Sequence, residues 1–261
     1  MKAIDLHIHS NHSSDATSTL DEIAQIASEK KMDVIAITNH IPELAGHIWY
    51  GDCDSIIKMK QQRDALEDQH QVRILIGAEI DVIDTTGALA YPSTNLSEFE
   101  FIVSGVHRYP ITTRGTDKMH FTRPFPNQDS MHYGIAEYYR ITEGILRNPH
   151  VDVLAHPLYA FSFLFTDELK PNAVSMFPEI YIREIMKLAA MEGKAVELNA
   201  AQVHLMNELW FQYGDEFGVQ YSIGSDSHKP QTICDVRKSL EVIEKYHIGE
   251  ERMIEPPVRR I

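Results

Sequence analysis

Residues 3–9 read AIDLHIH and residues 34–40 read VIAITNH, so each stretch is an apolar, β-branched run that ends on histidine. Runs of this kind predict buried β-strands. Three later runs close on a similar side chain, at Glu79 in ILIGAEI, His107 in FIVSGVH and His156 in VDVLAHP. Imidazole and carboxylate groups are the usual protein ligands of Zn, Fe and Mn. Their recurrence at strand ends predicts one metal site built by the whole fold.

Strands and helices are expected to alternate along the chain. The predicted strands are 3–9, 33–39, 73–80, 101–107, 151–156, 195–199 and 220–225, and the predicted helices lie near 19–31, 54–69, 130–146, 178–192, 204–216 and 231–246. Such alternation is typical of parallel strands with crossover helices. Seven strands predict a distorted (β/α)7 barrel, an α/β fold whose functional groups lie at the C-terminal strand ends. Because no Gly/Ser-rich linker interrupts the pattern, residues 1–261 are expected to form a single domain.

The alternation of side chains along a strand predicts which polar groups share a face. In the first strand Asp5, His7 and His9 lie on one side, with Asp5 deepest and able to orient a ligand. Glu197 and Asn199 share a face of a later strand. They either bond the metal ligands or fill the barrel as a polar layer.

Composition limits the partners of the chain. A hydrophobic fraction of 43% is enough for a sizeable core, and the formal net charge of −14 disfavours nucleic acid and anionic membranes. No apolar run is long enough to span a bilayer. The N-terminus enters the first predicted strand without a signal-peptide pattern, so we expect a cytoplasmic protein. Cys53 and Cys234 are far apart and predict reduced structural thiols, while the oligomeric state cannot be predicted.

A series of short motifs resembles the polymerase and histidinol phosphatase (PHP) family of metal-dependent phosphoesterases. These are HIHSNHSSD at 7–15, ITNH at 37–40, GAEIDV at 77–82, SGVH at 104–107, LAHP at 154–157, ELNA at 197–200 and GSDSH at 224–228. Taken in this order they cover essentially the whole chain. The resemblance is closest to the small stand-alone phosphatases of the family, and histidinol-phosphate phosphatases are similar but less close.

The resemblance implies a trinuclear centre of divalent transition metals, such as zinc, manganese or iron. It places His7, His9, Glu79 and Asp226 on one ion, Glu79, His107 and His156 on a second, and Asp15, His40 and His228 on a third. Glu79 would bridge two ions, and Glu79, Asp226 and His228 would act in catalysis. At Asp15 the chain departs from the histidine common in the family, which bears on the occupancy and metal preference of the third site.

The irregular segment 108–129, RYPITTRGTDKMHFTRPFPNQD, is a candidate lid over the site. It is locally basic within an acidic chain. Arg108 directly follows a predicted ligand, and we expect its guanidinium to contact substrate phosphate, because arginine binds phosphate with two parallel hydrogen bonds. The alternative is an ordinary solvated surface charge.

The favoured function is hydrolysis of a small phosphomonoester by metal-activated hydroxide. Histidinol phosphate is one possible substrate. A nuclease-like phosphodiesterase is an alternative, weakened by the acidic charge. Amidohydrolase-type C–N hydrolysis is another, although no predicted strand ends in the lysine that such sites use to bridge metals. A non-catalytic metal-binding module is disfavoured because every ligand position is filled.

Overall fold

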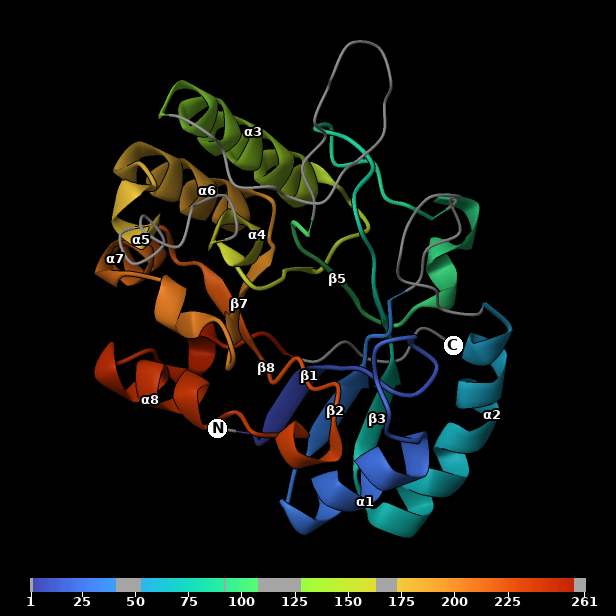
Figure 1. Cartoon of the computed structure of the whole chain (residues 1–261). Helices are drawn as coiled ribbons and strands as arrows, with labels where there is room; N and C mark the ends of the chain where they lie inside the picture. The colour runs from blue at the N-terminus through green and yellow to red at the C-terminus, as the bar shows by residue number, and fades with distance from the viewer. Residues whose placement is uncertain (1, 41–52, 92, 108–127, 163–172, 256–261) are drawn as a thin grey trace.

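The computed structural model describes residues 2–40, 53–91, 93–107, 128–162 and 173–255 (Figure 1). Its strands are β1 (Ile4–Ile8), β2 (Val34–Ile37), β3 (Arg73–Ile76), β4 (Ala78–Glu79), β5 (Ile102–Ser104), β6 (Val153–Leu154), β7 (Ala195–Asn199) and β8 (Gln220–Gly224). Its longer helices are α1 (Leu20–Glu29), α2 (Cys53–His70), α3 (Gln128–Arg147), α6 (Glu179–Met191), α7 (Glu208–Phe217) and α8 (Arg237–Lys245), with short α4 (Tyr159–Ser162) and α5 (Ala173–Met176). None of the helices described has the length and apolarity needed to cross a membrane.

All ladders between these strands are parallel, as the strand–helix alternation predicts. One sheet has the order β1-β2-β3 and the other the order β4-β5-β6-β7-β8. The predicted strand 73–80 is divided at Gly77 into β3 and β4, so the seven predicted strands appear as eight segments. A side chain at Gly77 would collide with the carbonyl of Phe101, and this close approach explains the glycine.

The two sheets meet at two seams, where isolated bridges replace a full ladder. At one seam the Glu79 amide donates to the Asn39 carbonyl at 3.0 Å. At the other the His9 amide donates to the Ser227 carbonyl at 2.9 Å. The strands thus form the distorted barrel that the sequence predicts, with its irregularities at the seams. Helices surround the strands on the outside, with α1 and α2 beside the three-stranded sheet (Figure 1).

Alternating side chains divide the strands into an apolar and a polar face. In β1 the apolar residues Ile4, Leu6 and Ile8 alternate with Asp5 and His7, and all five are buried. In β8, Tyr221 points outward, because its hydroxyl lies against Gly214 of α7. The hydrophobic core therefore lies between strands and helices, and the polar residues of β1 lie inside the barrel.

The first helix begins as its sequence predicts. The Thr19 hydroxyl accepts from the Glu22 amide at 3.2 Å, and the Glu22 carboxylate accepts from the Thr19 amide at 2.8 Å. This reciprocal capping box satisfies two amides that the helix leaves unpaired. It fixes the point at which the β1–α1 loop, which carries Asp15, turns into the helix.

Candidate metal centre

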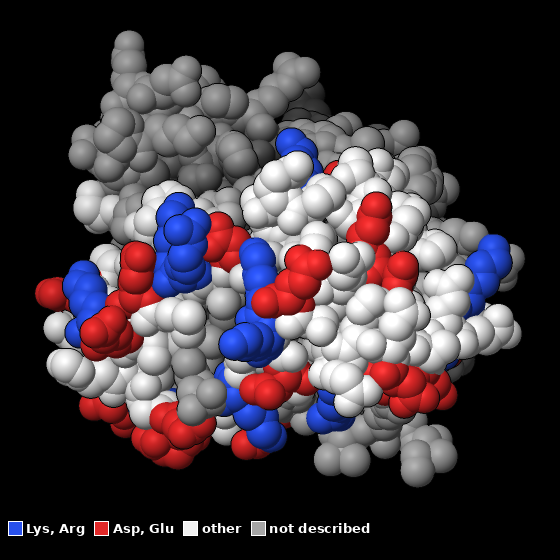
Figure 2. Space-filling view, turned by 90° about the horizontal axis from the view of Figure 1, so that it is seen from below, with Lys and Arg blue, Asp and Glu red and all other residues white. Residues whose placement is uncertain are grey.

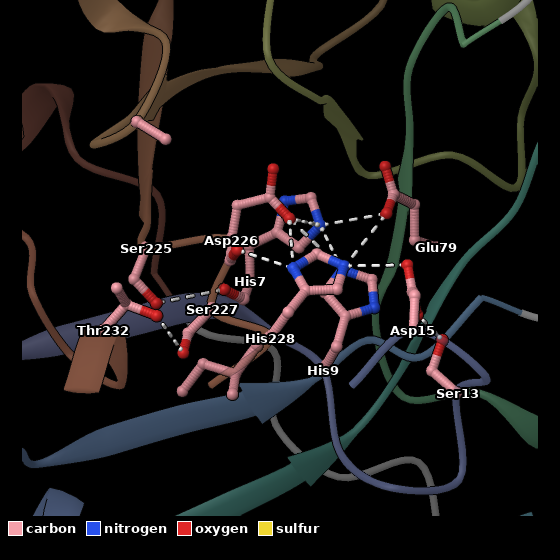
Figure 3. Close-up of polar contacts among 12 residues, drawn as sticks. His7, His9, Ser13, Asp15, Glu79, Ser225, Asp226, Ser227, His228 and Thr232 are labelled. Atoms are coloured by element: carbon pink, nitrogen blue, oxygen red, sulfur yellow. Dashed lines mark hydrogen bonds and ion pairs between the residues drawn. The ribbon is translucent and has the colours of Figure 1, made fainter. Parts of the chain in front are cut away.

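All nine predicted metal ligands lie within the described residues and converge at the C-terminal strand ends. His7 lies on β1 and Glu79 on β4, and the other seven lie in segments that follow strands: His9, Asp15, His40, His107, His156, Asp226 and His228. Figure 3 shows imidazole and carboxylate groups of His7, His9, Asp15, Glu79, Asp226 and His228 pointing toward one another. The barrel thus brings together residues more than 200 positions apart, from His7 to His228.

Three groups of these residues have ligand atoms close enough to hold a metal ion. The groups are His7, His9, Glu79 and Asp226; then His9, Asp15, His40 and His228; and lastly His40, Glu79 and His107. Within each group the ligand atoms lie within 4.8 Å of one another. The first group equals the first predicted set, and the second adds His9 to the third predicted set.

Glu79 is the centre of the arrangement, and its two oxygens face different histidines. Its Oε1 lies 2.7 Å from His156 Nε2 and 3.3 Å from His107 Nε2. Its Oε2 lies 3.1 Å from His7 Nε2 and 3.3 Å from His9 Nε2. The third group contains His40 where the resemblance implies His156, yet His156 still contacts the shared carboxylate. A side chain that is 1% exposed thus joins two of the groups.

The second group lies nearer the solvent. Asp15 Oδ2 is 3.0 Å from His228 Nε2 and 3.6 Å from His40 Nε2, and Asp15 Oδ1 accepts from the Ser13 hydroxyl at 2.7 Å. Burial alone would raise the pKa of Asp15, but the hydrogen bonds from His228 and Ser13 and the nearby His40 lower it below the usual range. Asp15 is therefore an anionic ligand candidate.

Burial and neighbouring charge set opposite protonation states at two of the histidines. Burial lowers the pKa of His40 to about 3, despite the nearby Glu79 carboxylate. Burial also acts to lower the pKa of His107, but the carboxylates of Glu79 and Asp81 outweigh it and raise the value to about 9. Asp81 Oδ1 lies only 2.7 Å from His107 Nδ1. His40 is thus neutral and ready to bind a metal, whereas His107 would release a proton when it does so.

The donor set fits a divalent cation. His7 Nε2 and His9 Nε2 lie 3.2 Å apart, and Asp226 Oδ1 lies 3.6 Å from the first and 3.3 Å from the second. Two imidazole lone pairs that face each other repel, and only a proton or a cation between them makes the contact favourable. Neutral imidazole together with carboxylate is a common ligand set for zinc and related metals.

Hydrogen bonds outside the ligand sets orient several of the rings. They run from Nδ1 of His7 to Glu197 at 2.8 Å, from Nδ1 of His107 to Asp81 at 2.7 Å, and from Nδ1 of His228 to the Asp226 carbonyl at 2.9 Å. Each leaves Nε2 directed to the centre, as is usual for metal-binding histidines. Asp81 was not among the predicted site residues. Its position two residues after Glu79, within the same GAEIDV motif, was the available signal.

A match to a protein-family model shows the family to which the chain belongs. The PHP domain model matches residues 5–201, which contain seven of the nine ligand candidates. The chain belongs to the PHP family. The matched segment begins at Asp5, on the first strand of the barrel, two residues before the first of the motifs that resemble the PHP family.

Similar proteins extend the PHP match over the whole chain. A probable phosphatase from Aliivibrio fischeri is 24% identical over 264 residues, covering 96% of this chain and 88% of the relative. A probable phosphatase from a Thermoanaerobacter species is 24% identical over 267 residues, covering 99% and 92%. The crystal structure of histidinol phosphate phosphatase from Lactococcus lactis, complexed with zinc, L-histidinol and phosphate, matches with a TM-score of 0.66 at 17% identity, covering 97% and 99%. The match to the Lactococcus lactis structure confirms the α/β barrel fold.

Two of the candidate metal ligands lie in strained backbone. His156 and Asp226 have positive φ angles of 27° and 54°, and Leu158 follows with 69°. Residues other than glycine rarely adopt positive φ angles, and such backbone strain is concentrated at functional sites. Gly105 is also explained here, because a side chain at that position would collide with the His156 ring.

Several weaker sequence predictions lie elsewhere. Arg108, and residues 108–127 of the candidate lid 108–129, are outside the described residues, so the proposed phosphate contact stays a prediction. Tyr159 is half-buried beside the centre, with its ring centroid 5.1 Å from that of His156 and 5.8 Å from that of His107. Cys234 is buried and free, as predicted for a structural thiol.

Proposed function

We propose that this protein is a metal-dependent phosphatase that hydrolyses a small phosphomonoester. The observation that carries the proposal is the convergence of nine imidazole and carboxylate side chains at one end of the barrel. The PHP match and the relatives named probable phosphatases, which align over nearly the whole chain, support it. The relative from Lactococcus lactis was crystallised with zinc and phosphate, which supports the same chemistry.

The proposed centre holds three divalent ions on the nine candidate ligands, with zinc, manganese or iron as the candidate metals. Bound ions of this kind polarise phosphoryl oxygens, neutralise a leaving alkoxide and lower the pKa of a water molecule. Glu79 is proposed to hold two ions, because its two oxygens face different histidines. Asp226 and His228 are proposed to complete the catalytic set at its solvent-facing side, where their side chains are 17% and 27% exposed.

Recognition of an anion by this acidic protein depends on which groups face the solvent at the proposed centre. The carboxylate of Glu79 is 1% exposed and is surrounded by imidazoles, so it does not present a negative surface to the solvent. At the rim, His107 and Tyr159 add an imidazole and a half-buried phenol. An arriving phosphate would also meet the partly exposed carboxylates of Asp15 and Asp226, whose negative charge the proposed metal ions would offset. Arg108 is proposed as an additional phosphate contact on sequence grounds alone.

Two alternatives have less support. Phosphodiesterase action on nucleic acid would need a broad basic surface, but the net charge is −14, and Figure 2 shows acidic and basic groups interspersed over one face. Amidohydrolase chemistry of the lysine-bridged type would need a buried lysine, and no lysine within the described ranges is buried. Histidinol phosphate remains one candidate among small monoesters. We also propose that residues 1–261 form one domain, since β1 and the segment after β8 share a seam.

The test compares substrates under matched metal conditions. Metal-free protein is reconstituted separately with zinc, manganese or ferrous iron, then assayed with an aryl phosphate, the corresponding bis-aryl diester and an end-labelled oligonucleotide. The monoester should have the highest kcat/KM, because its dianion interacts more strongly with a cationic centre than a diester monoanion does. Faster turnover of the oligonucleotide would replace the phosphatase assignment with a nuclease. A panel of natural monoesters that includes histidinol phosphate would then define the substrate.

A further inference from the structure

Strand β7 contributes none of the nine ligand candidates, yet it lies between two strands that precede such ligands. It pairs with β6 on one side and β8 on the other. Glu197, in the middle of β7, is paired in register with Ser222 of β8. Its side chain is 1% exposed and points into the polar interior of the barrel. A buried carboxylate at this position requires compensation from the groups around it.

The two oxygens of Glu197 bind groups from two different strand ends. Oε1 accepts from His7 Nδ1 at 2.8 Å, and Oε2 accepts from the His156 backbone amide at 2.6 Å. Oε2 also accepts from Asn199 Nδ2 at 3.2 Å, and the same amide group lies 3.3 Å from Asp226 Oδ2. One carboxylate thus connects candidate ligands that follow or lie on β1 and β6, and through Asn199 it reaches the ligand after β8.

The contact with His7 determines which ring nitrogen carries the proton. A carboxylate only accepts, so Nδ1 must donate to Glu197 and the neutral ring keeps its lone pair on Nε2. That nitrogen is the one directed to the centre, 3.1 Å from Glu79 Oε2. The opposite tautomer would place a hydrogen atom where a metal must bind. The Glu197 contact therefore selects the tautomer of His7 that can bind a metal.

The backbone of β8 passes close to the Glu197 carboxylate. A Cβ at Gly224 on β8 would overlap both Glu197 Oε1 and the Cβ of His7. Gly224 has an ordinary negative φ angle, so its backbone conformation does not require glycine. The absence of a side chain at 224 is explained by the close approach of Glu197, which is independent evidence that this carboxylate is held in one position.

We infer that Glu197 is a positioning residue of the metal centre, which holds His7 in its metal-binding tautomer and joins ligands from three strands. The inference rests on the metal centre of the proposed function. It assigns β7 a role that its lack of ligands would otherwise leave unexplained. Loss of a carboxylate that supports a metal-binding histidine typically weakens metal binding by about 10- to 100-fold.

Glu197→Gln tests the inference sharply, because a glutamine amide cannot satisfy all the contacts. The site of Oε2 faces two donors, the His156 amide and Asn199 Nδ2, so the amide oxygen of glutamine belongs there. The NH2 group then faces His7 Nδ1 and must donate to it. This moves the His7 proton to Nε2 and blocks the nitrogen that the metal needs. The change in volume is negligible, so a loss of packing does not account for the result.

Metal affinity of metal-free protein is measured by competition with a chromophoric chelator, for the wild type, for Glu197→Gln and for Glu100→Gln. Glu100 is a matched control, since its carboxylate also accepts a backbone amide, from Ile76 at 2.8 Å, but lies outside the centre. We expect about 10- to 100-fold weaker metal binding for Glu197→Gln and wild-type affinity for Glu100→Gln. Equal affinity of wild type and Glu197→Gln would overturn the inference, whereas a wild type that binds no metal would overturn the proposed function.

A second measurement needs no variant. Long-range proton–nitrogen NMR of the zinc-loaded wild type should show His7 protonated at Nδ1 and metal-bound at Nε2. Metal bound at His7 Nδ1 would overturn the inference even if Glu197→Gln failed to fold. In Glu197→Gln the same spectrum should lack the metal-bound Nε2 signal of His7, a change that a purely structural role would not produce.

Discussion

Removing the charge of Glu79 should damage the metal centre far more than removing the charge of Asp15. Five histidine nitrogens lie within 3.4 Å of the Glu79 oxygens, whereas Asp15 has two at 3.0 and 3.6 Å. Glu79 is 1% exposed and Asp15 is 17% exposed. The two substitutions Glu79→Gln and Asp15→Asn both replace a carboxylate by an amide of similar size, so they compare the positions directly.

The magnitudes follow from burial. Removing one partner from a buried set of charges amounts to about 3–5 kcal/mol, which at about 1.4 kcal/mol per factor of ten is about 150- to 4,000-fold in metal affinity. For the more exposed Asp15 the relevant quantity is a hydrogen bond to a charged group, about 1.5–3 kcal/mol, or about 10- to 150-fold.

Chelator competition gives the affinities, and elemental analysis gives the number of ions retained. We expect Glu79→Gln to lose more than one ion and Asp15→Asn to lose at most one. An Asp15→Asn variant that loses as much affinity as Glu79→Gln would refute the view that Glu79 joins two groups. Glu100→Gln again serves as the control for removal of a carboxylate elsewhere.

Further predictions concern other parts of the molecule. Dialysis against a chelator should abolish phosphatase activity, and zinc, manganese or iron should restore it, whereas activity that survives complete metal removal would exclude the proposed centre. Gly214→Ala should lower the free energy of unfolding by about 1–3 kcal/mol in chemical denaturation, because the new methyl group would overlap the Tyr221 hydroxyl. Adding Tyr221→Phe to this variant should recover part of the loss. If the effects of the two substitutions on the free energy of unfolding simply add, the contact is not supported. Burial raises the pKa of Tyr221 to about 12, so wild-type stability should fall between about pH 10 and pH 12 more steeply than that of Tyr221→Phe, and parallel curves would contradict this. Arg108→Ala should raise KM and weaken inhibition by inorganic phosphate without changing metal content. An unchanged KM would favour the alternative, that Arg108 is an ordinary solvated surface charge.

Short-range periodicity predicted the parts of the site that depend on one strand. The two-residue alternation places His7 and His9 on the same face, and their Nε2 atoms do lie 3.2 Å apart. The rule that functional groups follow the C-terminal strand ends predicted the convergence of the remaining ligands. Both inferences need only local sequence and the parallel arrangement of strands, and both are confirmed by the structure.

For Asp5 the same reasoning predicted the contact with His7 but not the other partners of its carboxylate. Its place below His7 suggested that it orients a ligand, and its carboxylate accepts the His7 backbone amide at 3.3 Å. It also accepts the backbone amides of Ser225 at 2.8 Å and Cys234 at 3.1 Å. Asp5 therefore orders the segments after β8 and leaves the His7 ring to Glu197. The choice between these roles depends on strand neighbours that lie 190 or more residues away, which periodicity within one strand cannot identify.

The alternation of side chains along the strands separates the candidate ligands from the hydrophobic core. In β1 the interior face carries Asp5 and His7, and the opposite face carries Leu6 in the apolar layer. Asp15 lies outside both faces, in the loop between β1 and α1, and it reaches the centre through His228 and His40. Exchange of histidine for aspartate at this position removes no group from the hydrophobic core. Such an exchange would alter the charge and reach of one group of candidate ligands, while the barrel and the Glu79-centred groups would remain.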